Sequence, residues 1–363
     1  MKKLLALLLA AVMVLSVAAV ASADEMKVAM ITDYGDITDQ SFNQTTYEAC
    51  KAFCEANGVE FTYKKPTGDS TAERVAMIEA AIDEGYNTIV MPGYAFGEAI
   101  KETAPEYEDV TFIGLDVSAG DLGDDFVLPE NLYCAVYQEE LCGYMAGYAA
   151  VKLGYKHLGF VGGMAVPAVV RYGYGFVQGA NAAAEDKSAV TVEYVYGNQF
   201  FGDADITAYM DNWYQTKGVE VVFACGGGIF TSACEAALKV ENGKVIGVDV
   251  DQSGVITSLY GDPTLTVTSA MKGLAATVNT LLAEVKDGSF EGGKIDNLGL
   301  VSADDPSLNY VGIPETTQFT DAFTMDDYKA MVADMYNGVI IVSNDTTVEP
   351  TVEIAVDYQG NIK

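Results

Sequence analysis

Histidine and basic residues are scarce in this chain of 363 residues. It contains one histidine, His157, and 20 lysines and arginines against 52 acidic residues. A single histidine leaves few groups for general-base catalysis, and the G-x-S-x-G, H-E-x-x-H and kinase motifs are missing. With no C-x2-C pair either, the sequence lacks a recognisable metal site. The shortage of cations argues against nucleic acid as a partner, because polyanion binding needs a basic face. We therefore expect a protein that is not an enzyme and needs neither metal nor cofactor.

Long apolar runs are confined to the N-terminus. Residues 1–23 place Lys2 and Lys3 before an apolar stretch that ends at Ala21-Ser22-Ala23. This order predicts a secretory signal peptide, and no later run is apolar enough to span a bilayer. The mature chain would be exported to the periplasm or the cell surface, with a net charge of −34. No cysteine stands near the cleavage site, so the sequence predicts no lipid anchor there.

The six cysteines leave two alternatives open. They are Cys50, Cys54, Cys134, Cys142, Cys225 and Cys234. An even number in an exported chain permits three disulfides, with fifteen possible pairings. Equally, the thiols could be free and buried as small apolar side chains.

Strand-like and helix-like segments alternate along the chain, which predicts an α/β fold with parallel sheets. The first series has apolar runs at 27–32, 59–64, 87–93 and 110–116, and the second has them at 157–163, 190–197, 219–228 and 244–251. Segments with helical spacing follow most of them, including one at 136–153. Two similar series imply two similar lobes.

The polypeptide is expected to cross between the two lobes more than once. We place the first lobe at 24–133, with a return segment at about 255–300, and the second at 134–254, with a C-terminal segment at 301–363 that holds a strand at 338–345. Several connections between lobes would form a hinge.

Polar and aromatic residues collect where the predicted strands end. In open parallel sheets, ligands bind outside the carboxyl ends of the strands. These positions are held by Asp33, Phe42, Asn43, Asp116, Phe201, Gly227 and Asp249. Such a rim supplies hydrogen-bond acceptors, stacking faces and close backbone approach. The alternative for Asp33 and Asn43 is a turn or capping role, and for the phenylalanines a place in the core.

Four motifs resemble the basic membrane protein family of ABC-transporter solute-binding proteins, which includes purine-nucleoside-binding lipoproteins. They are "VAMITDYGDITDQSFNQTTYEA", "LGFVGGMAVPAVVRYGYGFVQGANAA", "VIGVDVDQ" and "VTSAMKG". The resemblance implies two Rossmann-like lobes of the periplasmic-binding-protein type I, similar to ribose-binding proteins, which close on a ligand.

The resemblance also implies roles for individual residues. Asp33, Phe42, Asn43, Asp116 and Asp249 match ligand contacts, and Lys272 matches a ligand lysine that would be charged beside Asp249 or Asp116. Phe201 matches the second stacking aromatic, with Phe200 as the rival. Arg171 lies where ribose-binding relatives carry a ligand arginine, although it could equally be a surface residue.

The chain departs from the family pattern at three further places. Ala165 replaces an acid after "GGM", "TSAMK" carries an extra alanine, and the loop "NQFFGDAD" lacks the usual proline. The implied function is a monomeric, exported protein that carries a purine nucleoside or a similar ligand to an ABC permease. A sugar-like ligand or a sensory role is the alternative.

Overall fold

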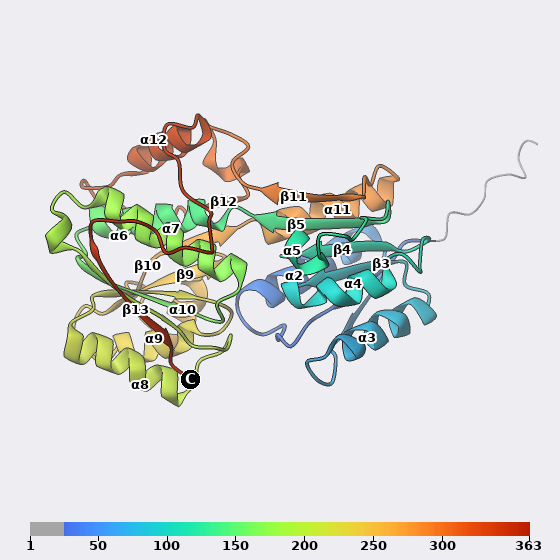
Figure 1. Ribbon diagram of the computed structural model, residues 1–363, viewed down its shortest axis with the longest axis horizontal. Coiled ribbons are helices and arrows are strands. Elements are labelled where there is room, and N and C mark those ends of the chain that lie inside the picture. Colours follow the sequence, from blue (N-terminus) through green and yellow to red (C-terminus); the bar gives the residue numbers. More distant parts are fainter. Residues whose placement is uncertain (1–24) are drawn as a thin grey trace, which may run out of the picture.

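The computed structural model describes residues 25–363, and the predicted signal peptide lies outside this range. The protein consists of two α/β lobes built on separate sheets, which lie side by side in Figure 1. Within residues 25–363, none of the helices is both long and apolar enough to cross a membrane.

The first lobe has a six-stranded sheet in the order β11-β5-β4-β3-β1-β2. Its neighbouring strands are all parallel. The strands are β1 (Lys27–Ile31), β2 (Glu60–Lys64), β3 (Thr88–Pro92), β4 (Thr111–Leu115), β5 (Leu132–Tyr137) and β11 (Lys294–Leu298).

Five helices cover the two faces of this sheet. They are α2 (Phe42–Asn57), α3 (Thr71–Asp83), α4 (Gly97–Thr103), α5 (Ala119–Leu122) and α11 (Leu274–Asp287). Helices α2 and α11 contribute to the core on one face, and α3 and α4 to the core on the other. Local capping defines their ends: Ser70 accepts a hydrogen bond from the Glu73 amide at the start of α3.

The second lobe has a seven-stranded sheet in the order β12-β10-β9-β8-β6-β7-β13. Only β12 among these described strands is antiparallel to its neighbour. The strands are β6 (His157–Gly162), β7 (Thr191–Tyr196), β8 (Val221–Cys225), β9 (Lys244–Asp249), β10 (Thr266–Lys272), β12 (Val311–Gly312) and β13 (Ala355–Asn361).

Helices again cover both faces of the second sheet. They are α6 (Glu139–Lys152), α7 (Pro167–Ala183), α8 (Ala204–Asn212), α9 (Phe230–Ala237), α10 (Ser253–Tyr260) and α12 (Met325–Tyr336). Helices α6, α7 and α12 share one core, and α8, α9 and α10 share the other.

Three crossovers join the lobes: β5 to α6, β10 to α11, and β11 to β12. The first two lie later than the sequence placed them. Strand β5 continues to Tyr137, and α10 and β10 remain in the second lobe, so the return segment begins only after Lys272. Residues 136 and 137 have helical spacing in the sequence, but they pair with Asn297 and Leu298 of β11.

The prediction of a strand at 338–345 is wrong. This segment has no regular structure, and its Ser343 amide and carbonyl bond to the side chain of Gln178 on α7. The tail instead forms β13, parallel to β7.

All six cysteines are free and buried, so the alternative of buried thiols is the one the structure shows.

Candidate functional site

A cavity of about 640 Å³ lies between the lobes, at the carboxyl ends of strands from both sheets. Hydrogen bonds cross from one lobe to the other beside it. Ser41 Oγ donates to Asp249 Oδ2 at 2.5 Å, and Gln252 Nε2 donates to the Gln40 carbonyl at 3.0 Å. The lobes therefore meet around the cavity as a closed cleft.

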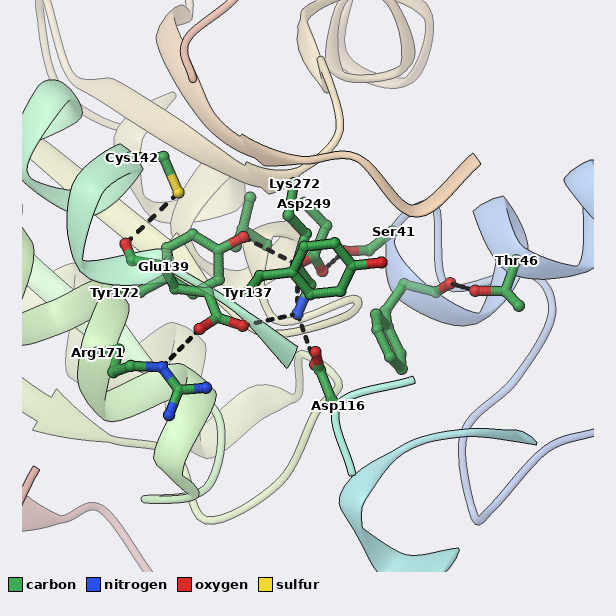
Figure 2. A network of polar contacts seen from close by, with 12 residues as sticks. Ser41, Thr46, Asp116, Tyr137, Glu139, Cys142, Arg171, Tyr172, Asp249 and Lys272 are labelled. Carbon is green, nitrogen blue, oxygen red and sulfur yellow. Dashed lines mark hydrogen bonds and ion pairs between the residues drawn. The ribbon is translucent and has the colours of Figure 1, made fainter. Parts of the chain in front are cut away.

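Lys272 lies at the end of β10, lines the cleft, and is the centre of a network of polar contacts (Figure 2). Its Nζ lies 2.5 Å from Asp116 Oδ2, 3.4 Å from Glu139 Oε1 and 3.7 Å from Asp249 Oδ1. Burial lowers the pKa of Lys272, but the three carboxylates more than offset this, so its pKa lies above the usual range. The structure places this lysine beside both Asp116 and Asp249.

Glu139 is a member of this charge network that the sequence analysis did not predict. It is the first residue of α6, is fully buried, and accepts a hydrogen bond from Arg171 Nε at 2.6 Å while it contacts Lys272. An acidic pair directly after a strand was the available signal, but the helix predicted from residue 136 hid it. Arg171 is thus neither free nor a plain surface residue, because it lines the cleft and pairs with Glu139.

The two acids at the strand ends have strained backbones. Asp116 and Asp249 have φ angles of 58° and 65°, in the left-handed region that L-residues seldom adopt. Both line the cleft. Strain of this kind tends to collect at functional sites, where it holds a side chain in a required direction. Burial raises the pKa of Asp116 to about 6, although the neighbouring Lys272 acts to lower it.

Asp33 and Asn43 line the cleft from the first lobe. Asp33 Oδ1 accepts a hydrogen bond from the Gly35 amide at 2.7 Å, and burial raises the pKa of Asp33 to about 6. Asn43 donates its side-chain amide to Asp39 Oδ2 at 3.1 Å. Asn43 Oδ1 and Asp116 Oδ1 are both buried and have no hydrogen-bond partner within residues 25–363. Both residues line the cleft.

The aromatic residues lie in two groups. Phe42 packs under Lys272, whose Nζ is 4.7 Å from the ring centroid. Across the cleft, Phe200 stacks on Tyr34 with ring centroids 6.2 Å apart and planes 13° apart. Phe201 also lines the cleft, but the residue is 61% exposed. The structure therefore gives Phe200 a protein partner and leaves the Phe201 ring accessible.

The glycine loop at 226–228 packs against the loop that carries Phe200 and Phe201. Gly227 has a φ angle of 51°, and a Cβ atom there would lie 2.6 Å from the Phe200 carbonyl oxygen. The neighbouring Gly228 amide donates to that same carbonyl at 2.9 Å. Gly227 thus lines the cleft through backbone that only glycine accommodates without displacement.

Acidic groups dominate the lining of the cleft. Seven aspartates line it: Asp33, Asp36, Asp39, Asp69, Asp116, Asp121 and Asp249. The cations among the lining residues are Arg171 and Lys272, and both are paired with carboxylates. The cleft is therefore suited to a ligand that donates hydrogen bonds and is neutral or cationic, because an anion would meet unbalanced negative charge.

A family model described as ABC transporter substrate-binding protein PnrA-like matches residues 26–346. The chain belongs to this family, Bmp. The Bmp-family protein is thus a substrate-binding protein of an ABC transporter rather than an enzyme. Proteins of this kind bind small-molecule ligands and act with transporter permeases.

Two relatives of the Bmp-family protein illustrate its similarity. It is 28% identical to the "ABC transporter nucleoside-binding protein BmpA" of Lactococcus lactis, over 75% of this chain and 78% of the relative. It is also 28% identical to "Basic membrane protein B" of Borreliella burgdorferi, over 82% of this chain and 83% of the relative.

The fold is shared with solved solute-binding proteins. A structure of such a protein from Aeropyrum pernix K1 matches with a TM-score of 0.66 at 22% identity, covering 88% of each chain. One from Conexibacter woesei matches with a TM-score of 0.65 at 22% identity, covering 88% of this chain and 99% of the other. These likenesses show the periplasmic-binding-protein type I fold of the Bmp-family protein.

Proposed function

We propose that this Bmp-family protein binds a nucleoside, and most favourably a purine nucleoside, in the interlobe cleft. One combination of features carries the proposal. Asp116 and Asn43 have buried acceptor oxygens without a hydrogen-bond partner within residues 25–363, and Phe201 is exposed in the same cleft. Both cations that line the cleft are already paired with carboxylates. A nucleoside has hydroxyl donors for such acceptors and a planar base for stacking, and it carries no phosphate. The Lactococcus lactis relative, a nucleoside-binding protein, supports the same ligand class.

In this proposal, the acids and Asn43 hold the sugar and the base edge. Asp116 Oδ1, Asn43 Oδ1 and the Asp33 carboxylate accept hydrogen bonds, and Asp249 is held beside them by Ser41 and Tyr172. A site built from buried acceptors discriminates against analogues that lack the matching hydroxyl, because its own groups are then left unpaired.

Phe42 and Phe201 supply the stacking faces in this proposal. Phe200 is engaged with Tyr34, whereas Phe201 presents an exposed ring to the cleft. Stacking of a base on an aromatic ring contributes about 1–3 kcal/mol. Gly227 lets the backbone of this loop approach closely.

Lys272 holds the carboxylates in place. An ammonium group has three N–H donors, and three carboxylates lie within 3.7 Å of Nζ. Its direct contact with the ligand stays a prediction from the family resemblance.

The proposed cellular setting is export followed by delivery of the ligand to an ABC permease, with the protein acting as a monomer. A neighbouring gene for a kinase or regulator, instead of an ATPase and permeases, would favour the sensory alternative.

A thermal-shift screen of residues 25–363 tests the ligand class. The panel comprises purine and pyrimidine nucleosides, free bases, nucleoside monophosphates, pentoses and hexoses. A ligand at a thousandfold over its Kd adds roughly 4 kcal/mol to the free energy of unfolding, which shifts the melting curve clearly. We expect a shift with inosine, adenosine or guanosine and none with the monophosphates. A shift with a sugar alone would overturn the nucleoside assignment and leave the substrate-binding role intact.

A further inference from the structure

The last residues of the chain form an element that the family match does not cover. The match ends at residue 346, whereas the structure continues through 347–363 and ends in β13. Figure 1 shows this dark-red segment crossing the second lobe and finishing close to α8. Its end lies beside the loop at 198–203, which carries Phe200 and Phe201.

The segment is anchored firmly before it reaches the loop. Asn181 Oδ1 on α7 accepts hydrogen bonds from the amides of Glu353 and Ile354, and the Ile354 side chain is buried in the core. Strand β13 then pairs with β7 in parallel register from Ala355 to Tyr358. The tail is thus built into the edge of the sheet.

An irregularity near its end directs the chain toward the cleft. The register shifts between Tyr358 and Asn361, and Gly360 has a φ angle of 70°. Such a shift bends an edge strand and re-aims the residues after it. The Ile362 amide then donates to the Tyr196 carbonyl at 2.8 Å, two residues before the loop at 198–203 begins. This places Lys363 against the loop.

Lys363 contacts residues on either side of Phe200 and Phe201. Its Nζ forms an ion pair with Asp203 Oδ2 and donates to Gln199 Oε1 at 3.3 Å. Gln199 Nε2 in turn donates to the Phe201 carbonyl at 2.9 Å and to Asp203 Oδ2 at 2.9 Å. One cation therefore holds Gln199, which directly precedes Phe200, and Asp203, which lies two positions after Phe201.

Asp203 connects this cation to the fixed part of the lobe. Its Oδ1 accepts hydrogen bonds from the amides of Asp205 and Ile206, both at 3.0 Å, and so caps α8. The backbone bond from Ile206 and then Lys363 lower the pKa of Asp203 to about 2, so the carboxylate is ionised at neutral pH. The opposite side of the loop is held by the Gly228 amide on the Phe200 carbonyl.

We propose that residues 355–363 form a brace for the aromatic loop of the cleft, with Lys363 as its positioning residue. The brace fixes the place of Phe201 before a ligand arrives, which lowers the entropy lost when the ring is ordered on binding. The effect on ligand affinity rests on the proposed function, whereas the effect on the loop does not.

The test compares Lys363→Ala with Lys363→Arg and with Lys239→Ala in residues 25–363. Lys239 is the matched control, because it lies just after α9 in the same lobe, pairs with Asp211 of α8 at 2.8 Å, and does not line the cleft. Hydrogen exchange of the amides at 198–203 is measured without ligand, together with the melting temperature. The Kd for the tightest nucleoside of the screen is measured by calorimetry.

For Lys363→Ala we expect exchange at 198–203 to accelerate about tenfold, with the melting temperature nearly unchanged. The Kd should rise about fivefold, and Lys363→Arg should restore both values. Unchanged exchange at 198–203 in Lys363→Ala, or an equal effect of Lys239→Ala, would overturn the brace. If wild type binds no nucleoside, the nucleoside assignment fails, and the exchange data still decide on the brace.

Discussion

Asp33 belongs to the proposed site, and its burial makes the ionised carboxylate unfavourable for folding. Burial raises its pKa to about 6, above that of an unfolded aspartate. The folded state therefore binds the proton more tightly than the unfolded state does. The resulting contribution to stability is complete below about pH 4 and is lost as the pH rises through 6. At pH 8 the ionised, buried carboxylate is thus unfavourable for folding.

We predict that Asp33→Asn is more stable than wild type at pH 8, by about 1–3 kcal/mol. Its amide oxygen can still accept from the Gly35 amide. At pH 4 the two proteins should unfold at the same denaturant concentration, since Asp33 is then protonated. Asp262→Asn is the control, because hydrogen bonds from Thr264 lower the pKa of this exposed carboxyl. An Asp33→Asn protein no more stable than wild type at pH 8 would contradict this account of Asp33.

Lys272 is the residue on which the buried carboxylates depend. Replacing it by methionine leaves Asp116, Glu139 and Asp249 together without their shared cation. We expect Lys272→Met to lower the free energy of unfolding by about 3–5 kcal/mol at pH 7.5. The deficit should shrink near pH 5, where Asp116 can take up a proton. Urea unfolding at both pH values measures it, with the exposed Lys239→Met as control, and a deficit that does not change with pH would argue against this charge balance.

At the scale of elements, α6 and α7 set the position of Glu139 and Arg171. The two helices lie side by side in Figure 1 and approach closely through glycines. A Cβ atom at Gly147 would lie 2.1 Å from the Phe176 carbonyl oxygen, and one at Gly179 would lie 2.0 Å from the Tyr144 carbonyl oxygen. Either contact would force the helices apart, and with them the Glu139–Arg171 pair.

We predict that Gly147→Ala destabilises the protein by about 1–3 kcal/mol through overpacking, even though alanine has the higher helix propensity. It should also weaken ligand binding, since Glu139 lies two turns away on the same helix. Gly254→Ala on α10 is the matched control, because nothing lies within 4 Å of the added atom. Thermal unfolding of both variants checks this. Equal stability of the two would show that α6 and α7 can separate without loss.

The sequence predicted elements well where periodicity and strand ends decide them. Asp33, Asp116 and Asp249 follow apolar runs, and parallel sheets bring such ends together, so their meeting in one cleft was foreseeable. The partners of Lys272 were only partly foreseeable, because Glu139 depends on where β5 stops. Strand β13 gave no clear signal, since "AVDYQGN" is half polar and its pairing with β7 is a tertiary contact.

At the scale of the whole molecule, charge is the dominant feature. The chain carries a formal charge of −32 at pH 7, and self-repulsion of this size opposes the compact state. We expect the melting temperature to rise by about 2–4 °C or more between 10 mM and 300 mM NaCl, as the Debye length falls. A melting temperature that falls with salt would show that local ion pairs outweigh the repulsion.

We propose that the cleft between the lobes binds a nucleoside through Asp116 and Asp249. Calorimetric titration of inosine, adenosine and guanosine into wild type and into Asp116→Ala/Asp249→Ala tests it most directly, at pH 7.5 and with folding of both proteins checked by thermal unfolding. We expect one nucleoside bound per wild-type chain and no binding to the folded double variant. Equal affinity of both proteins, or no binding of any nucleoside to wild type, would contradict it.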